Sequence, residues 1–179
     1  LPRVAGYMAA KRFCNKAMTI IRNDEYTNFD EASADFKLAI NLDPNFARPY
    51  AGLLELSHCE TRGGVPLFTP DDFRNFARRL EQLAPGSPAT YCAHSIVNWN
   101  DRHYAEATND ALAAIKVDPN YEFGHTWYAW LLLRFGWPEE ARKQMGISEK
   151  LTPKNAVIYR TLGDIYYAEG DYSKAIAQY

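Results

Sequence analysis

Two neighbouring pairs of histidine and cysteine are the side chains best suited to metal ligation, namely His58-Cys59 and Cys92 with His94. On neighbouring parallel helices, Cys59 would lie eight positions further along than Cys92, which is about 12 Å at 1.5 Å per residue. The ligands of one zinc ion must all come within about 2.0–2.3 Å of it. The spacing therefore predicts packed or edge residues, and we expect no metal site.

Adjacent acids are the next candidates, because paired carboxylates can act as general acid and base. Asp71-Asp72 and Glu139-Glu140 each fall at the start of an expected helix, where negative charge complements the helix dipole. The sequence contains no GxGxxG, GxxxxGK[ST], HExxH or GxSxG motif. We therefore expect no catalytic residues, no cofactor and no enzymatic activity.

Composition restricts the partners and the compartment. The chain has 179 residues, 47% of them hydrophobic, and a net charge of −2, with no run of more than two basic residues to attract a nucleic-acid backbone. Its longest apolar run, residues 127–133, is too short to span a bilayer. Three cysteines without a CxxC pair favour a reducing compartment such as the cytoplasm. A periplasmic location stays open if a membrane span precedes this sequence, which starts without methionine and which we interpret as a fragment.

Similar helix endings recur along the chain. Asp-Pro-Asn at 43–45 and 118–120 and Thr-Pro-Lys at 152–154 each end one helix shortly before another begins, and Pro119 and Pro153 are 34 residues apart. Such a helix pair has two apolar faces and cannot bury both alone, so pairs stack into arrays. The sequence predicts an all-α fold, a right-handed α-solenoid of antiparallel helix pairs in one domain, 1–179. Its expected units are 1–46 and 47–87, both irregular, 88–121, 122–155 and the truncated 156–179.

The last unit carries the clearest motif, with an aromatic residue, leucine, a small residue and tyrosine on its first helix and alanine on its second. These residues are Tyr159, Leu162, Gly163, Tyr166, Ala175 and Tyr179. The pattern resembles the tetratricopeptide repeat. The resemblance covers nearly the whole chain and implies a superhelix that binds a protein or peptide in its concave groove.

The irregular start carries a second resemblance. A long first helix at 3–22, the segment FDEASADFKLAINLDPNFARPYAGLLEL at 29–56 and WYAWLLLRFGWPEEA at 127–141 are similar to the repeat half of ToxR/OmpR-type winged-helix regulators. That resemblance implies the sensory or assembly region of a bacterial transcriptional regulator. Two alternatives stay open: a freestanding scaffold or adaptor, and the accessory region of a kinase or adenylate cyclase.

Helical spacing predicts which side chains face the concave groove. The expected partner-binding residues are Arg48, Glu55, Ile96, Trp99, Phe123, Trp130, Arg134, Arg160, Asp164 and Tyr167. Large aromatic residues on such a surface indicate a peptide- or helix-binding groove. In the alternative interpretation Trp130 packs against the neighbouring unit, and Arg48 and Arg160 pair with Glu55 and Asp164.

Two classes of partner contact can be addressed further. Chaperone adaptors of this family grip a terminal carboxylate with lysine and asparagine, but this sequence has Ala51, Glu55, Cys92 and Ile96 at the matching positions, which argues against that partner. The sequence ends in an apolar second helix, from which we expect either a continuing solenoid or self-association. No nucleic-acid or membrane partner is expected for this fragment.

Overall fold

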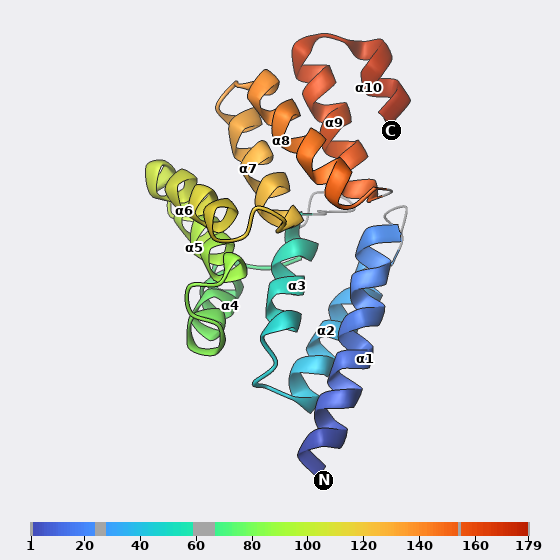
Figure 1. Cartoon of the computed structure of the whole chain (residues 1–179), viewed down its shortest axis with the longest axis vertical. Helices are drawn as coiled ribbons and strands as arrows, with labels where there is room; N and C mark the ends of the chain where they lie inside the picture. The colour runs from blue at the N-terminus through green and yellow to red at the C-terminus, as the bar shows by residue number, and fades with distance from the viewer. Residues whose placement is uncertain (1, 24–27, 59–66, 154, 179) are drawn as a thin grey trace.

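Ten helices and no strand make up the part of the chain that the computed structural model describes, residues 2–23, 28–58, 67–153 and 155–178. The helices are α1 (Pro2–Asn23), α2 (Phe29–Leu42), α3 (Ala47–His58), α4 (Pro70–Leu83), α5 (Pro88–Asn100), α6 (Tyr104–Val117), α7 (Glu122–Arg134), α8 (Pro138–Leu151), α9 (Ala156–Glu169) and α10 (Tyr172–Gln178). Each packs on the next in the chain, as Figure 1 shows. The predicted α-solenoid of helix pairs is therefore confirmed.

Small residues let the two helices of each pair approach closely. Ala32, Ala107, Ala141 and Ala175 recur at one position of the second helices, and all four are buried. On the first helices, Ser95 and Ala129 are fully buried at the matching place. The self-similarity of the sequence thus marks the pairing surfaces, where a larger side chain would push the helices apart.

Local signals set the helix ends. The Thr69 hydroxyl accepts from the Asp72 amide at 3.2 Å while the Asp72 carboxylate accepts from the Thr69 amide at 2.8 Å, which is a reciprocal capping box at the start of α4. At the end of α9, Gly170 adopts φ +80°, a left-handed conformation that glycine tolerates best. The segment Arg-Gly-Gly-Val-Pro at 62–66, whose glycines and proline predict a loop, lies outside the described residues.

Helix α3 is enclosed from two sides. Its Leu53 and Leu56 belong to the core shared with α1 and α2, whereas its Leu54 belongs to the core shared with α4, α5 and α7. All three leucines are at most 1% exposed. Helix α3 therefore separates two hydrophobic cores and contributes side chains to both.

Aromatic rings fill the irregular second unit. In α4 a large residue, Phe73, stands at the position where the other second helices carry alanine, and it packs with Phe68 and Phe76 while Ala77 is buried one turn later. The ring centroids of Phe68 lie 6.1 Å from Phe73 and 5.4 Å from Phe76, both in edge-on geometry. This cluster anchors α4 beside α2 and α3.

The first helices of the pairs form a closed ring. Helices α1, α3, α5, α7 and α9 contact one another in that order, and the start of α9 returns to α1 (Figure 1). Val157 of α9 is buried in the same cluster as Met18 and Ile21 of α1. The two ends of the described solenoid thus meet, and the inner helices surround a central space.

At Gly52 of α3, the packing of α3 on α2 leaves no space for a side chain. A Cβ at Gly52 would overlap the ring of Phe36 on α2, whereas a Cβ at Gly146 of α8 would meet nothing within 4 Å. Gly52→Ala is expected to lower the free energy of unfolding by about 1–3 kcal/mol through overpacking. Gly146→Ala is expected to raise it by about 0.5–1 kcal/mol, because alanine favours a helix interior. Urea denaturation of both variants checks this, and equal effects would contradict the close approach of α2 and α3.

Candidate functional site: a central chamber

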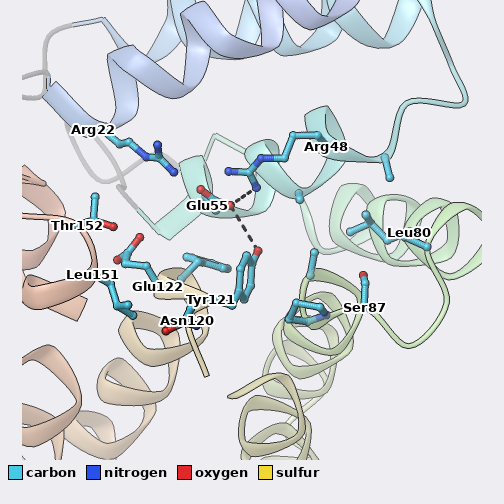
Figure 2. A pocket seen from close by; sticks show the side chains of 16 residues that line it. Arg22, Arg48, Glu55, Leu80, Ser87, Asn120, Tyr121, Glu122, Leu151 and Thr152 are labelled. Carbon is cyan, nitrogen blue, oxygen red and sulfur yellow. Dashed lines mark hydrogen bonds and ion pairs between the residues drawn. The ribbon is translucent and has the colours of Figure 1, made fainter. Parts of the chain in front are cut away.

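A chamber of about 660 Å³ lies inside the ring of first helices (Figure 2). Its volume falls in the range of about 300–1,000 Å³ usual for ligand sites. The lining comes from the ends of α1, α4 and α8 and from α3, α5 and α7. It consists of Arg22, Ala47, Arg48, Ala51, Glu55, Leu80, Ala84, Ser87, Pro88, Ala89, Asn120, Tyr121, Glu122, Phe123, Leu151 and Thr152. The chamber is therefore mostly apolar with a few charged groups.

An ion pair on α3 forms one side of the chamber. The Arg48 guanidinium donates to Glu55 Oε1 at 2.6 Å, and the Tyr121 hydroxyl donates to the same oxygen at 3.4 Å, as the dashed lines in Figure 2 mark. Glu55 is 8% exposed. Its carboxylate raises the pKa of Arg48 above its ordinary value, and burial raises the pKa of Tyr121 well above its own. The guanidinium and the carboxylate form an ion pair, so their charges offset each other.

Glu122 is a second carboxylate in the chamber and belongs to a different element. It is the first residue of α7, and its Oε1 accepts from the Thr126 hydroxyl at 2.6 Å. Among the described residues it makes no ion pair. Burial raises the pKa of Glu122 to about 7, while the Thr126 hydrogen bond and the charges of Arg22 and His125 oppose the shift and that of Glu55 adds to it. Near neutral pH this carboxyl group is thus poised between its two protonation states.

The predicted groove residues fall into three places, of which the chamber is the first. Arg48, Glu55 and Phe123 line it. Arg48 and Glu55 are paired, as the alternative interpretation proposed. Phe123 is only 5% exposed and packs its ring at 6.3 Å from Tyr121.

The second place is a smaller cavity of about 130 Å³, lined by Ile96, Trp99 and Trp130 together with Ser57, Phe73, Asn100 and Trp127. Trp130 stacks on Trp127 at 4.9 Å and meets Trp99 edge-on at 5.0 Å, and the Arg134 guanidinium lies 5.5 Å from its ring centre. Ile96 is 3% exposed. These contacts join the α5/α6 pair to α7, so the tryptophans pack between units and also border a cavity.

The third place is the surface of α9, where Arg160, Asp164 and Tyr167 lie apart from both cavities. Tyr167 is 64% exposed and contacts Tyr172 of α10 edge-on at 5.4 Å. The ten predicted groove residues thus lie in three places, two of them at cavities and the third on α9.

The chamber residues that sequence reasoning missed include Arg22, Tyr121 and Glu122. An acid in the first turn of a helix normally complements the helix dipole, so the sequence gave no separate reason to assign Glu122 to a binding site. The Asp-Pro-Asn turn at 118–120 could have indicated it, because this turn directs the start of α7 toward the chamber. Arg22 enters the lining from the end of α1, far from the other lining residues in the sequence.

The described residues support neither a metal site nor a reactive cysteine. They contain no group of three histidine, cysteine or acidic side chains suited to an ion, while Cys59 and the side chain of His58 lie outside the description. Burial raises the pKa of Cys14 to about 11 and raises the pKa of Cys92 as well, which keeps both as thiols. No described helix has the length and apolar character needed to cross a bilayer.

Comparison with solved structures places the fold among tetratricopeptide-repeat proteins. The chain resembles TTC0263, a thermophilic TPR protein of Thermus thermophilus, with a TM-score of 0.65, 15% identity and coverage of 95% of this chain and 88% of that one. It also resembles PilF of Pseudomonas aeruginosa, with a TM-score of 0.52, 16% identity and coverage of 97% and 75%. A third similar structure is YrrB, described as a TPR protein with an unusual peptide-binding site, with a TM-score of 0.50, 15% identity and coverage of 93% and 80%. No protein-family model and no curated protein sequence matches the chain. At these identities the similarity establishes the fold.

The Arg48–Glu55 pair predicts an asymmetric stability effect. Arg48→Met is expected to lower the free energy of unfolding by about 2 kcal/mol, because it removes the guanidinium from a desolvated carboxylate, and Arg48→Met/Glu55→Gln is expected to recover most of that loss. Lys174→Met, in the exposed Lys174–Asp171 pair, is the control and is expected to leave the unfolding midpoint nearly unchanged. A double variant less stable than Arg48→Met would contradict the assignment of the loss to a stranded Glu55 charge.

Glu122 predicts a pH dependence of stability. Its pKa is raised from 4.5 to about 7 on folding, so the folded state binds more protons in this window and wild-type stability falls as pH rises through it. Glu122→Gln lacks this loss, so its melting temperature relative to wild type is expected to rise from pH 4.5 to pH 7 and then level off. Thermal melts across this range measure the difference. The exposed first-turn variant Glu140→Gln is the control, and a Glu122→Gln difference that does not change with pH would contradict the prediction.

Proposed function

We propose that this chain is a non-catalytic protein-interaction module that anchors a peptide segment of its partner in the central chamber. The observation that carries the proposal is the chamber itself, a cavity of about 660 Å³ to which several helix pairs contribute and which combines an apolar lining with a few charged groups. Binding sites of this composition use apolar contact for affinity and the polar groups for orientation. The solenoid fold, shared with YrrB among others, supports the same class of function.

The aromatic cluster around Trp130 is a second anchoring place of the same module. Trp99 and Trp130 are half-buried, Trp127 is buried, and Trp137 and Tyr104 at the edge of the cluster are 55% and 43% exposed. Aromatic side chains of this kind are enriched in interface hot spots. We rank the chamber above the aromatic cluster as a binding site, because the charged groups of the chamber provide specificity. The rings of the cluster are already explained by their packing between helices.

A second, more specific proposal concerns the biological role of this interaction module. The resemblance of the irregular start to the repeat half of winged-helix regulators supports a sensory or assembly role in bacterial transcription. Reading the coding sequence upstream of Leu1 separates the options. A winged-helix segment supports the regulator, a kinase or cyclase domain supports the accessory region, and a start codon beside Leu1 supports a freestanding adaptor. Self-association through α10, which exposes Tyr172 and Ile176, stays a prediction.

Filling the chamber tests the proposed function. Ala89 of α5 lines the chamber and Ala105 of α6 is exposed away from it, so Ala89→Trp and Ala105→Trp form a matched pair. A phage-displayed library of random dodecapeptides is selected on the wild-type chain, and the recovered peptides are measured by calorimetry. Ala89→Trp is expected to weaken their binding at least about tenfold, which corresponds to about 1.4 kcal/mol, and Ala105→Trp to leave it unchanged.

Circular dichroism and melting temperature establish that both variants fold. Recovery of no binding peptide, or equal binding by a folded Ala89→Trp variant, would overturn the proposed function. Loss of binding in both variants would place the peptide site outside the chamber and overturn the proposal as well.

A further inference from the structure

Two arginines and two glutamates line the chamber, but only one arginine and one glutamate form an ion pair with each other. Arg48 and Glu55 neutralise each other at 2.6 Å, and the Arg48 guanidinium also contacts Met18 Sδ at 3.4 Å. Arg22 and Glu122 remain, and neither makes an ion pair with a described residue. Arg22 is exposed at the end of α1, whereas Glu122 is partly buried. The interior therefore holds a carboxylate without a counter-ion among the described residues, and a cation stands at the rim.

The Glu122 carboxylate is held in place and one of its oxygens is available. Oε1 accepts from the Thr126 hydroxyl at 2.6 Å, and that hydroxyl lies 3.2 Å from Ser148 Oγ of α8. Oε2 has no hydrogen-bond partner among the described residues. Figure 2 shows the side chain pointing from the start of α7 toward Arg22 and Glu55, across the open volume. A ligand in the chamber would meet this oxygen.

Other acceptors lie on the same side. Leu151 and Thr152 line the chamber at the end of α8, where the last carbonyl groups of a helix have no partner within it and carry the negative end of its dipole. The two donors nearest Glu55 are already engaged, since Arg48 and the Tyr121 hydroxyl both bond its carboxylate. The interior thus favours a ligand that donates hydrogen bonds and carries positive charge.

The shape of the available site selects among cations. Glu122 Oε1 already accepts from Thr126, so a guanidinium that bonds both oxygens would have to share Oε1, whereas a compact ammonium needs only Oε2. A lysine side chain also brings an apolar stem, and Ala51, Ala89 and Phe123 supply the apolar wall along which such a stem can lie. Arg22 at the rim is placed to attract an acidic residue beside that lysine.

We propose that the central chamber recognises a lysine side chain of the partner segment, whose ammonium pairs with Glu122 Oε2 and whose stem packs on the apolar lining. The proposal rests on the proposed function and names its ligand. An ammonium there would supply the counter-ion for Glu122. A partner with lysine next to an acidic residue fits both the interior and the rim.

Synthetic peptides test the assignment. Acetyl-Ala-Ala-Lys-Ala-Ala-amide is titrated into the ¹⁵N-labelled chain at about pH 8, above the pKa of Glu122, and followed through the amide signals of α3 and α7. The comparison peptides carry arginine or norleucine in place of lysine, and a further one has a free N-terminus and no lysine. The lysine peptide is expected to bind at least about tenfold more tightly than each of the others. Equal binding of the norleucine, arginine or free N-terminal peptide would overturn the lysine assignment.

Variants assign the preference to Glu122. Glu122→Gln is expected to abolish the preference for lysine over norleucine, and Glu140→Gln in the exposed first turn of α8 is expected to keep it. Arg22→Gln is expected to keep the lysine preference and to lose any gain from an aspartate placed after the lysine. A lysine preference that survives in Glu122→Gln, or an aspartate gain that survives in Arg22→Gln, would overturn the corresponding contact.

A pH series on the wild-type chain gives an independent readout. Protonation of Glu122 removes its charge, so lysine binding is expected to weaken below about pH 7, by a factor approaching about ten per pH unit. Arg22, Glu55 and His125 also act on this carboxyl group, so the series is repeated in Glu122→Gln, where the dependence must disappear. A dependence of the same size in that variant would overturn the proposal. The phage selection decides the proposed function separately, because library peptides can bind in the chamber without lysine.

Discussion

The two-sided burial of helix α3 is the constraint on which the rest of the structure depends. One of its faces completes the core of α1 and α2, and the opposite face completes the core of α4, α5 and α7. A helix that is apolar on two sides cannot end an array, so pairs must stack on both flanks. Gly52 shows how little space remains, because the Phe36 ring of α2 occupies the place of a side chain.

The stacked pairs bring the start of α9 against α1 and leave a pocket of about 660 Å³ between α3, α5 and α7. The groups inside it then lose water without all gaining partners. For Arg48 and Glu55 the ion pair offsets the free-energy cost of losing water. For Glu122 the same loss of water raises the pKa of its carboxyl group. A carboxylate in that environment is a natural position for a partner's cation.

The aromatic residues show how packing and binding can share side chains. Trp127, Trp130 and Trp99 form a continuous set of stacked and edge-on rings between the α5/α6 pair and α7. Trp127 also donates its indole N–H to Ser95 Oγ at 2.7 Å, so a small residue of the repeat pattern also serves as a hydrogen-bond acceptor. Rings held this firmly present a rigid edge to any partner that reaches them.

The sequence by itself determined the helices, their pairing and the class of fold, because these depend on local signals. Proline-containing turns, the Thr69 cap and alanines at a repeated position act over a few residues or within one helix pair. It also predicted that Arg48, Glu55 and Phe123 would face the inner side, since helical spacing alone decides that. Only the tertiary structure decided that α9 returns to α1, because superhelical curvature is a sum of small rotations that no single residue encodes. The packing of the pairs brought Arg22 and Glu122 to one chamber, placed Ile96 at a second cavity and left Tyr167 exposed on α9, so the ten predicted groove residues lie in three places.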